Sequence, residues 1–258
     1  MISFAGKGGV GKTTNLALFL KYLSENHEEK DVLVIDSDPD ANIADVTQVD
    51  VKFSDTLGGK MKILKEKIQK RKLPPNVPKT QVIEGDVYRC LIEMEKFDLL
   101  EMGRQEGEGC YCFINSVLKN VIDTLSKNYD ITILDSPAGL EHFARKTSRD
   151  VTDLIIVTDP SRMGMHTMKR ILEIIDELSL DFERYWVLGN RFPDDLKHVL
   201  EERVDELKQE YLRLELLGFV PNDSEISEYN LIGKNLLELP ETNPVYQKVK
   251  DMFTRVLA

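Results

Sequence analysis

The feature that most constrains the fold is the segment GKGGVGKTT at residues 6–14. It fits the phosphate-loop pattern, and it lies between a short apolar stretch, MISFAG, and a segment with apolar residues at helical spacing. In such a loop backbone N–H groups surround phosphate oxygens, the lysine reaches the β- and γ-phosphates, and the threonine ligates magnesium. The segment therefore predicts a strand, a nucleotide-binding loop and a helix, with contacts made by Gly6, Gly8, Gly9, Val10, Gly11, Lys12, Thr13 and Thr14.

Apolar runs of strand length recur at residues 32–35, 97–103, 130–139, 153–160, 184–190 and 213–221, and helical patterns lie between most of them. The first of these runs is apolar at every position, which is typical of a parallel sheet with both faces covered. The alternation predicts an α/β fold with helices on both faces of the sheet, and together with the phosphate loop it predicts a three-layer P-loop NTPase fold with a mostly parallel central sheet flanked by helices. We expect residues 1–258 to form a single domain, with ligand sites at the carboxyl ends of the strands.

Composition excludes several classes of protein. The formal net charge of −11 argues against broad binding to nucleic acid or to anionic lipid, because both depend on excess lysine and arginine. No apolar run approaches the roughly 20 residues that cross a bilayer, and three cysteines do not make a disulfide framework. We therefore expect a cytoplasmic protein that acts on neither nucleic acid nor membrane.

Residues 52–80 differ from the rest, because a lysine-rich helical stretch is followed by a proline cluster. We interpret this segment as a surface insertion. A solvated helix and loop would explain it, and so would a partner-docking element.

A second lysine, Lys7, follows the first glycine of the loop, and KGGVGKT resembles the deviant phosphate loop of the MinD, ParA and nitrogenase iron protein superfamily. The resemblance implies a magnesium-dependent ATPase in which Lys7 reaches the partner's nucleotide, so that ATP drives formation of a homodimer. It also implies that Asp38 acts on the attacking water and that Gly139 senses the γ-phosphate, while Asp36 and Asp135 hold magnesium waters. The catalytic set would be Lys7, Lys12, Asp38 and Asp135. Capping of loops or helices is the alternative for the strand-end aspartates.

The same resemblance places adenine contacts late in the chain, after two further strands. They would come from Asn190, Arg191, Pro221, Asn222 and Asp223. A side-chain amide offers both a donor and an acceptor to a base edge. A turn-forming PND sequence, however, needs no ligand to explain it.

Two of the three cysteines, Cys110 and Cys112, lie one residue apart in GEGCYCFIN. Two thiolates can chelate Ni²⁺ or Zn²⁺, but a tetrahedral site takes four ligands. The four histidines are scattered, and we expect Cys90 to lie on a polar, separate segment. A closed homodimer would bring both pairs into one four-thiolate site, so we expect the segment 104–115 at a dimer interface.

Several segments in this order resemble the CooC-type ATPases, the nickel-insertion accessory proteins of carbon monoxide dehydrogenase: GKGGVGKTT, DSDPDAN, MGR before GEGCYC, AGLEHFAR, NRF and VPND. The resemblance implies an ATP-dependent metallochaperone whose target is carbon monoxide dehydrogenase or the related acetyl-CoA synthase. The segment DSPAG departs from it and has the commoner MinD form. His142, beside this segment, would assist metal relay or simply pack.

Three other functions stay open. A MinD-like or ParA-like positioning ATPase would act on membrane or DNA, and an iron–sulfur ATP-dependent reductase would share a cluster across a dimer. The cysteine pair could also form a redox-active disulfide. An amphipathic tail, with Val245, Val249, Met252, Phe253 and Val256 on one face, could bind lipid, but we expect it to dock on the domain.

Overall fold

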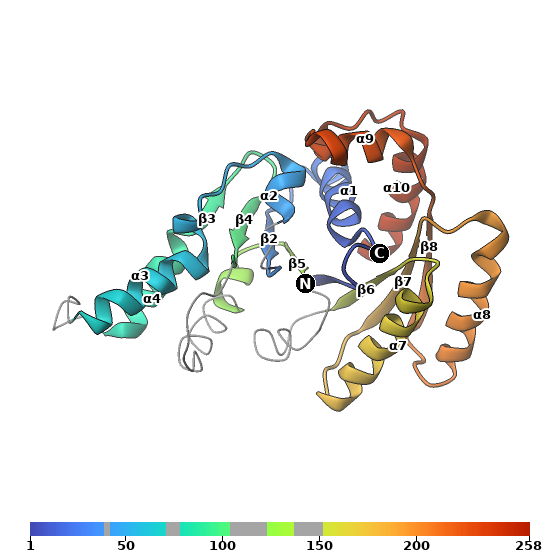
Figure 1. The fold of residues 1–258 in the computed structure, drawn as a ribbon, viewed down its shortest axis with the longest axis horizontal. Coiled ribbons are helices and arrows are strands. Elements are labelled where there is room, and N and C mark those ends of the chain that lie inside the picture. The colour runs from blue at the N-terminus through green and yellow to red at the C-terminus, as the bar shows by residue number, and fades with distance from the viewer. Residues whose placement is uncertain (39–41, 71–77, 104–122, 137–151) are drawn as a thin grey trace.

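The structure, a computed structural model, describes residues 1–38, 42–70, 78–103, 123–136 and 152–258, and it is built on one central sheet (Figure 1). The eight strands are ordered β3-β4-β2-β5-β1-β6-β7-β8, and every pair is parallel except β3 with β4. Their bounds are β1 Ile2–Ala5, β2 Val32–Asp36, β3 Leu91–Glu93, β4 Asp98–Glu101, β5 Ile131–Asp135, β6 Asp153–Thr158, β7 Arg184–Asn190 and β8 Leu214–Val220. The predicted mostly parallel sheet is confirmed. The short antiparallel edge strand β3 was not predicted, since its three residues are only partly buried.

Helices cover both faces of this sheet. One face is covered by α1 (Lys12–Asn26), α2 (Asn42–Thr47), α9 (Ser224–Ile232), the 3-10 turn η3 (Leu236–Glu238) and α10 (Pro244–Leu257). The other is covered by α3 (Leu57–Gln69), α4 (Lys79–Tyr88), α7 (Arg162–Glu177) and α8 (Lys197–Lys208), with the 3-10 turns η1 (Phe53–Asp55) and η2 (Asp194–Leu196) preceding α3 and α8. The predicted three-layer α/β fold is confirmed.

The two hydrophobic cores explain why residues 32–35 of β2 are apolar at every position. In β2, Leu33 and Ile35 point into the core that includes α3, α4, α7 and α8, whereas Val32 and Val34 point into the core around α1 and α10. Successive side chains alternate between the faces of a strand, and here both faces are buried.

The amphipathic tail forms α10, and its apolar face is buried against α1 as expected. All five of the apolar side chains singled out in the sequence are at most 7% exposed. Phe253 is fully buried, with its ring centroid 4.7 Å from that of Phe19. The burial of this face leaves none of its five apolar side chains available for lipid.

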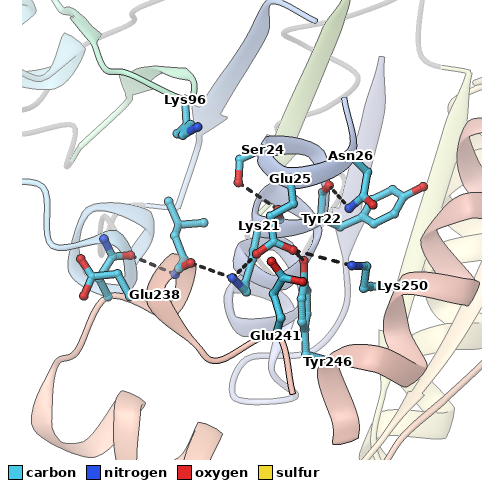
Figure 2. A network of polar contacts seen from close by, with 12 residues as sticks. Lys21, Tyr22, Ser24, Glu25, Asn26, Lys96, Glu238, Glu241, Tyr246 and Lys250 are labelled. Atoms are coloured by element: carbon cyan, nitrogen blue, oxygen red, sulfur yellow. Dashed lines mark hydrogen bonds and ion pairs between the residues drawn. The ribbon is translucent and has the colours of Figure 1, made fainter. Parts of the chain in front are cut away.

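Polar contacts between α1 and the C-terminal segment supplement this packing (Figure 2). The ammonium of Lys21 pairs with Glu25 and donates to the carbonyl of Leu237 at 3.0 Å. The hydroxyl of Tyr246 donates to Glu25, and the Lys250 ammonium lies 3.8 Å from the same carboxylate. Lys21 is 5% exposed, so its charge is stabilised chiefly by these neighbours.

The lysine-rich part of segment 52–80 forms α3, which is not a fully solvated helix. Leu57, Met61 and Leu64 are buried and belong to the same core as Ile83 and Val87 of α4. Among the described residues, every helix is too short or too polar to span a bilayer.

The prediction that Cys90 lies on a polar, separate segment was wrong. Cys90 lies in the turn between α4 and β3 and is 1% exposed in the core beneath α3 and α4. Burial raises the pKa of its thiol to about 12, so it is uncharged at neutral pH. The apolar residues of this core come from the preceding helix α4 and from α3, which is more distant in sequence, and the polar composition around Cys90 gave no sign of their packing.

Candidate nucleotide site

The phosphate loop, residues 6–11, connects the central strand β1 to α1 at the carboxyl end of the sheet. Gly11 precedes the first helical residue, Lys12, with φ of +94°. A Cβ atom at this position would lie 2.3 Å from the amide nitrogen of Asn190, so only glycine fits. Lys12 is 6% exposed, while Lys7 is partly exposed and Gly8 and Gly9 are exposed. The loop therefore presents its outer backbone to solvent and keeps its second lysine inside.

Asp135 meets the start of α1 from the neighbouring strand. It ends β5, in register with Phe4 of β1, and its Oδ2 accepts a 2.8 Å hydrogen bond from the hydroxyl of Thr13. Its Oδ1 is buried and has no hydrogen-bond partner among the described residues. Burial, followed by the charge of Asp36, raises the pKa of Asp135 to about 7, although Thr13 and Lys12 act in the opposite direction. A hydroxyl beside a carboxylate with a free oxygen suits Mg²⁺, which prefers oxygen ligands.

Asp36 ends β2 and is fully buried. Its two oxygens accept 2.9 Å hydrogen bonds from the backbone N–H groups of Asp38 and Ile43. Burial raises the pKa of Asp36 to about 6, and the two backbone hydrogen bonds reduce the shift. The capping arrangement, which was the alternative for Asp36, is thus present, and it ties the start of α2 to the partly exposed Asp38.

Sequence reasoning missed Glu101, a third buried carboxylate in the same row. It ends β4 in register with Asp36 and is 1% exposed. Burial and the charge of Asp36 raise the pKa of Glu101 to about 7, while a backbone hydrogen bond from Ala44 lowers it. The sequence feature that could have indicated Glu101 is its position as an acidic residue within the apolar run FDLLEMG.

The end of β7 braces the phosphate loop. The amide of Asn190 donates to the carbonyl of Val10, and the guanidinium of Arg191 donates to that of Gly9, both at 2.7 Å. Asn15 of α1, which the sequence analysis did not single out, donates to the Gly11 carbonyl at 2.8 Å. These contacts fix the loop from both sides.

The residues expected at adenine are brought together beside this brace. Asn190, Arg191, Pro221, Asn222 and Asp223 line a cavity of about 100 Å³ together with Gly11 and Thr14. Asp223 also caps α9, since its carboxylate accepts a 2.8 Å hydrogen bond from the N–H of Ile226. This helix cap accounts for Asp223 without a ligand, and its contact with adenine stays a prediction.

Cys110, Cys112, Gly139 and His142 lie outside the described residues. Within the described ranges, no three histidine, cysteine or acidic side chains are grouped in a way that could hold a metal ion.

A phosphate loop after a central parallel strand, faced by carboxylates at the ends of the neighbouring strands, defines the P-loop NTPase fold of the MinD and ParA type. More particularly, the chain belongs to the family described as an AAA domain, which matches residues 1–185.

Known proteins agree with this assignment. The chain is 38% identical to an uncharacterized ATP-binding protein of Methanocaldococcus jannaschii, over 100% of this chain and 98% of the relative. It is 27% identical to the carbon monoxide dehydrogenase accessory protein CooC of Rhodospirillum rubrum, over 92% and 89% of the two chains. The solved structure of the MinD cell division protein of Aquifex aeolicus matches with a TM-score of 0.66 at 20% identity, covering 99% of this chain and 96% of that one.

Proposed function

We propose that the chain is a magnesium-dependent ATPase that acts in the cytoplasm, with residues 1–258 forming one domain. The observation that carries this proposal is the hydrogen bond between Thr13 and Asp135 beneath the phosphate loop. Thr13 and the free oxygen of Asp135 would hold magnesium, which when bound supplies positive charge to the β- and γ-phosphates.

The chain's own residues have distinct roles in this proposal. Lys12, at the start of α1, binds the phosphates, while Asp38 orients the attacking water and is held in place by Asp36. Asn190 holds the phosphate loop through its hydrogen bond to the Val10 carbonyl, and the cavity beside Asn190 receives adenine. Lys7, which is partly exposed, reaches the nucleotide of a second protomer.

Gly139, outside the described residues, would sense the γ-phosphate. Its contribution in this proposal is a backbone N–H, as the resemblance to the superfamily implies.

We further propose that the ATPase delivers nickel or zinc to a client metalloenzyme. The support is the CxC pair seven residues after Gly103, together with the likeness to an accessory protein of carbon monoxide dehydrogenase. Cys110 and Cys112 of two protomers would hold one ion of this cargo with four thiolates. Carbon monoxide dehydrogenase or acetyl-CoA synthase would be the client.

Cys90 takes no part in this cargo site. It is buried, and a thiol with a pKa of about 12 is a poor ligand at neutral pH because the thiolate is the binding form. The variant Cys90→Ala is therefore a matched control for substitutions at Cys110 and Cys112.

The testing experiment is anaerobic equilibrium binding of Ni²⁺ and of Zn²⁺, with sedimentation to count subunits, with and without MgATP. We expect one metal ion per dimer in the wild type and in Cys90→Ala, and none in the double variant Cys110→Ser with Cys112→Ser. If the dimer forms on ATP without binding metal, the metal-delivery function is refuted and a positioning ATPase of the MinD or ParA type becomes the better interpretation. Bound iron together with a brown, visible absorbance after anaerobic purification would instead indicate an iron–sulfur reductase.

A further inference from the structure

Positive charge is concentrated on α3 and the residue that follows it, in a chain whose net charge is −11. Residues 60–70 contain a single acidic residue, Glu66, and five lysines, namely Lys60, Lys62, Lys65, Lys67 and Lys70. The proposed ATPase chemistry uses none of them, because the phosphate loop and its carboxylates lie on β1, α1, β2, β4 and β5.

The lysines have a defined place on the helix. The apolar stripe of α3 is buried toward α4 and the sheet, whereas Lys62, Ile63, Lys67 and Lys70 are exposed. Phe53 of η1 is 40% exposed, with the Lys62 ammonium 5.8 Å from its ring centroid. We call Phe53, Lys62, Ile63, Lys67 and Lys70 the basic face.

The basic face lies on a part of the molecule that extends outward. Figure 1 shows α3 and α4 reaching away from the strands, beyond the sheet edge formed by β3, and far from α7 and α8. A second protein could therefore approach α3 without meeting the α7 and α8 side of the domain.

Lysines recur at helical spacing along α3 and at the residue that follows it. Lys62 and Lys65, and likewise Lys67 and Lys70, are three positions apart in the sequence, and like charges at this spacing repel each other. Glu66, on the same helix, forms an ion pair with Lys70 at 3.4 Å. Ile63, 40% exposed among these lysines, adds apolar area suited to a protein contact.

The base of α3 is joined to the end of β4, from which the chain continues to the cysteine pair. The N–H of Gly58 donates to the carbonyl of Met102 at 2.8 Å, and the N–H of Met102 donates to that of Asp36 at the same distance. Gly103 has φ of +63°, and a Cβ there would lie 2.5 Å from the hydroxyl of Thr56. These contacts hold the start of α3, and with it the basic face, against Met102 and Gly103, which precede the proposed cargo segment in the sequence.

From these observations we propose that the basic face docks an acidic protein surface on the client that receives the metal, an inference that rests on the proposed function. A local basic face on an acidic chain suits a partner with a limited acidic patch, since long-range repulsion disfavours an extended polyanion such as DNA. Two exposed apolar side chains, Phe53 and Ile63, are too few to insert stably in a bilayer.

The test measures association of the nucleotide-loaded chain with purified nickel-free carbon monoxide dehydrogenase, at low and at physiological salt. The variant reverses two charges, Lys62→Glu with Lys67→Glu. The control, Lys169→Glu with Lys208→Glu, changes the net charge equally at two partly exposed positions on α7 and α8. We expect the variant to weaken association about tenfold or more, and the control to change it less than about twofold, with the difference shrinking as salt screens the charges.

Unchanged association in the variant, an equal loss in the control, or no association of the wild type would each overturn the inference. Anionic vesicles and duplex DNA are assayed in parallel, and lysine-dependent binding to either would show that the class of partner is wrong. Circular dichroism and MgATP binding verify that both variants fold. Metal binding is measured on the same samples, so that a protein that holds no metal refutes the delivery function separately from the docking surface.

Discussion

The row of buried carboxylates at the ends of β4, β2 and β5 predicts that the nucleotide-free protein loses stability as the pH rises. The pKa of Glu101 increases from 4.5 in an exposed glutamate to about 7 in the folded chain. Between these values the folded chain binds more protons than the unfolded chain, so the free energy of unfolding falls with pH. At ~1.4 kcal/mol per pKa unit, the ionised Glu101 costs the native state about 3 kcal/mol above neutral pH.

The perturbation is Glu101→Gln, which keeps an acceptor oxygen for the Ala44 N–H and removes the charge. Chemical denaturation without magnesium or nucleotide should show the variant more stable than the wild type by about 2–3 kcal/mol near pH 8, and nearly equal to it near pH 4.5. Glu95→Gln, at an exposed position, is the control and should change neither value by more than about 0.5 kcal/mol. A Glu101→Gln protein with the wild-type dependence on pH would refute the reasoning.

Three further predictions follow from single residues. Gly11→Ala places a Cβ against Asn190 and should abolish ATP binding in equilibrium titration, whereas Gly8→Ala, where a Cβ meets nothing within 4 Å, should fold as stably as the wild type. Phe253→Ala removes a fully buried ring and should lower the free energy of unfolding by about 3–5 kcal/mol, and a loss below 1 kcal/mol would mean that α10 is not docked. Lys7→Ala should abolish ATP-dependent dimerisation in sedimentation while the monomer still binds ATP, and intact dimers would disprove its role.

Most of the fold followed from local patterns. Runs such as Val32–Ile35 are apolar at every position because both faces of the sheet are buried, and that property is visible without any tertiary information. β3 was missed because an edge strand of three residues buries too little to produce a pattern.

The site could be predicted where the spacing of residues in one short segment determines which ligand they bind. The glycines and Thr13 follow from the loop pattern, but the bracing of the loop by Asn190 does not, since the two segments meet only through the order of β1, β6 and β7. Glu101 was missed for the same reason: its significance comes from its register with Asp36, and pairing of β2 with β4 cannot be read from either strand.

The packing of α1 against α10 has a consequence for biosynthesis. β1 and α1 are synthesised before the elements that flank and cover them, since β1 lies in the sheet between β5 and β6, and α1 is covered by α10. The contact of Phe19 with Phe253 and the hydrogen bond of Glu25 with Tyr246 can form only after more than two hundred further residues have been translated. Contacts so distant in sequence form late and slowly. A nascent chain therefore leaves the apolar side of α1 that carries Phe19 uncovered until α10 has been translated, and such exposed apolar surface favours aggregation.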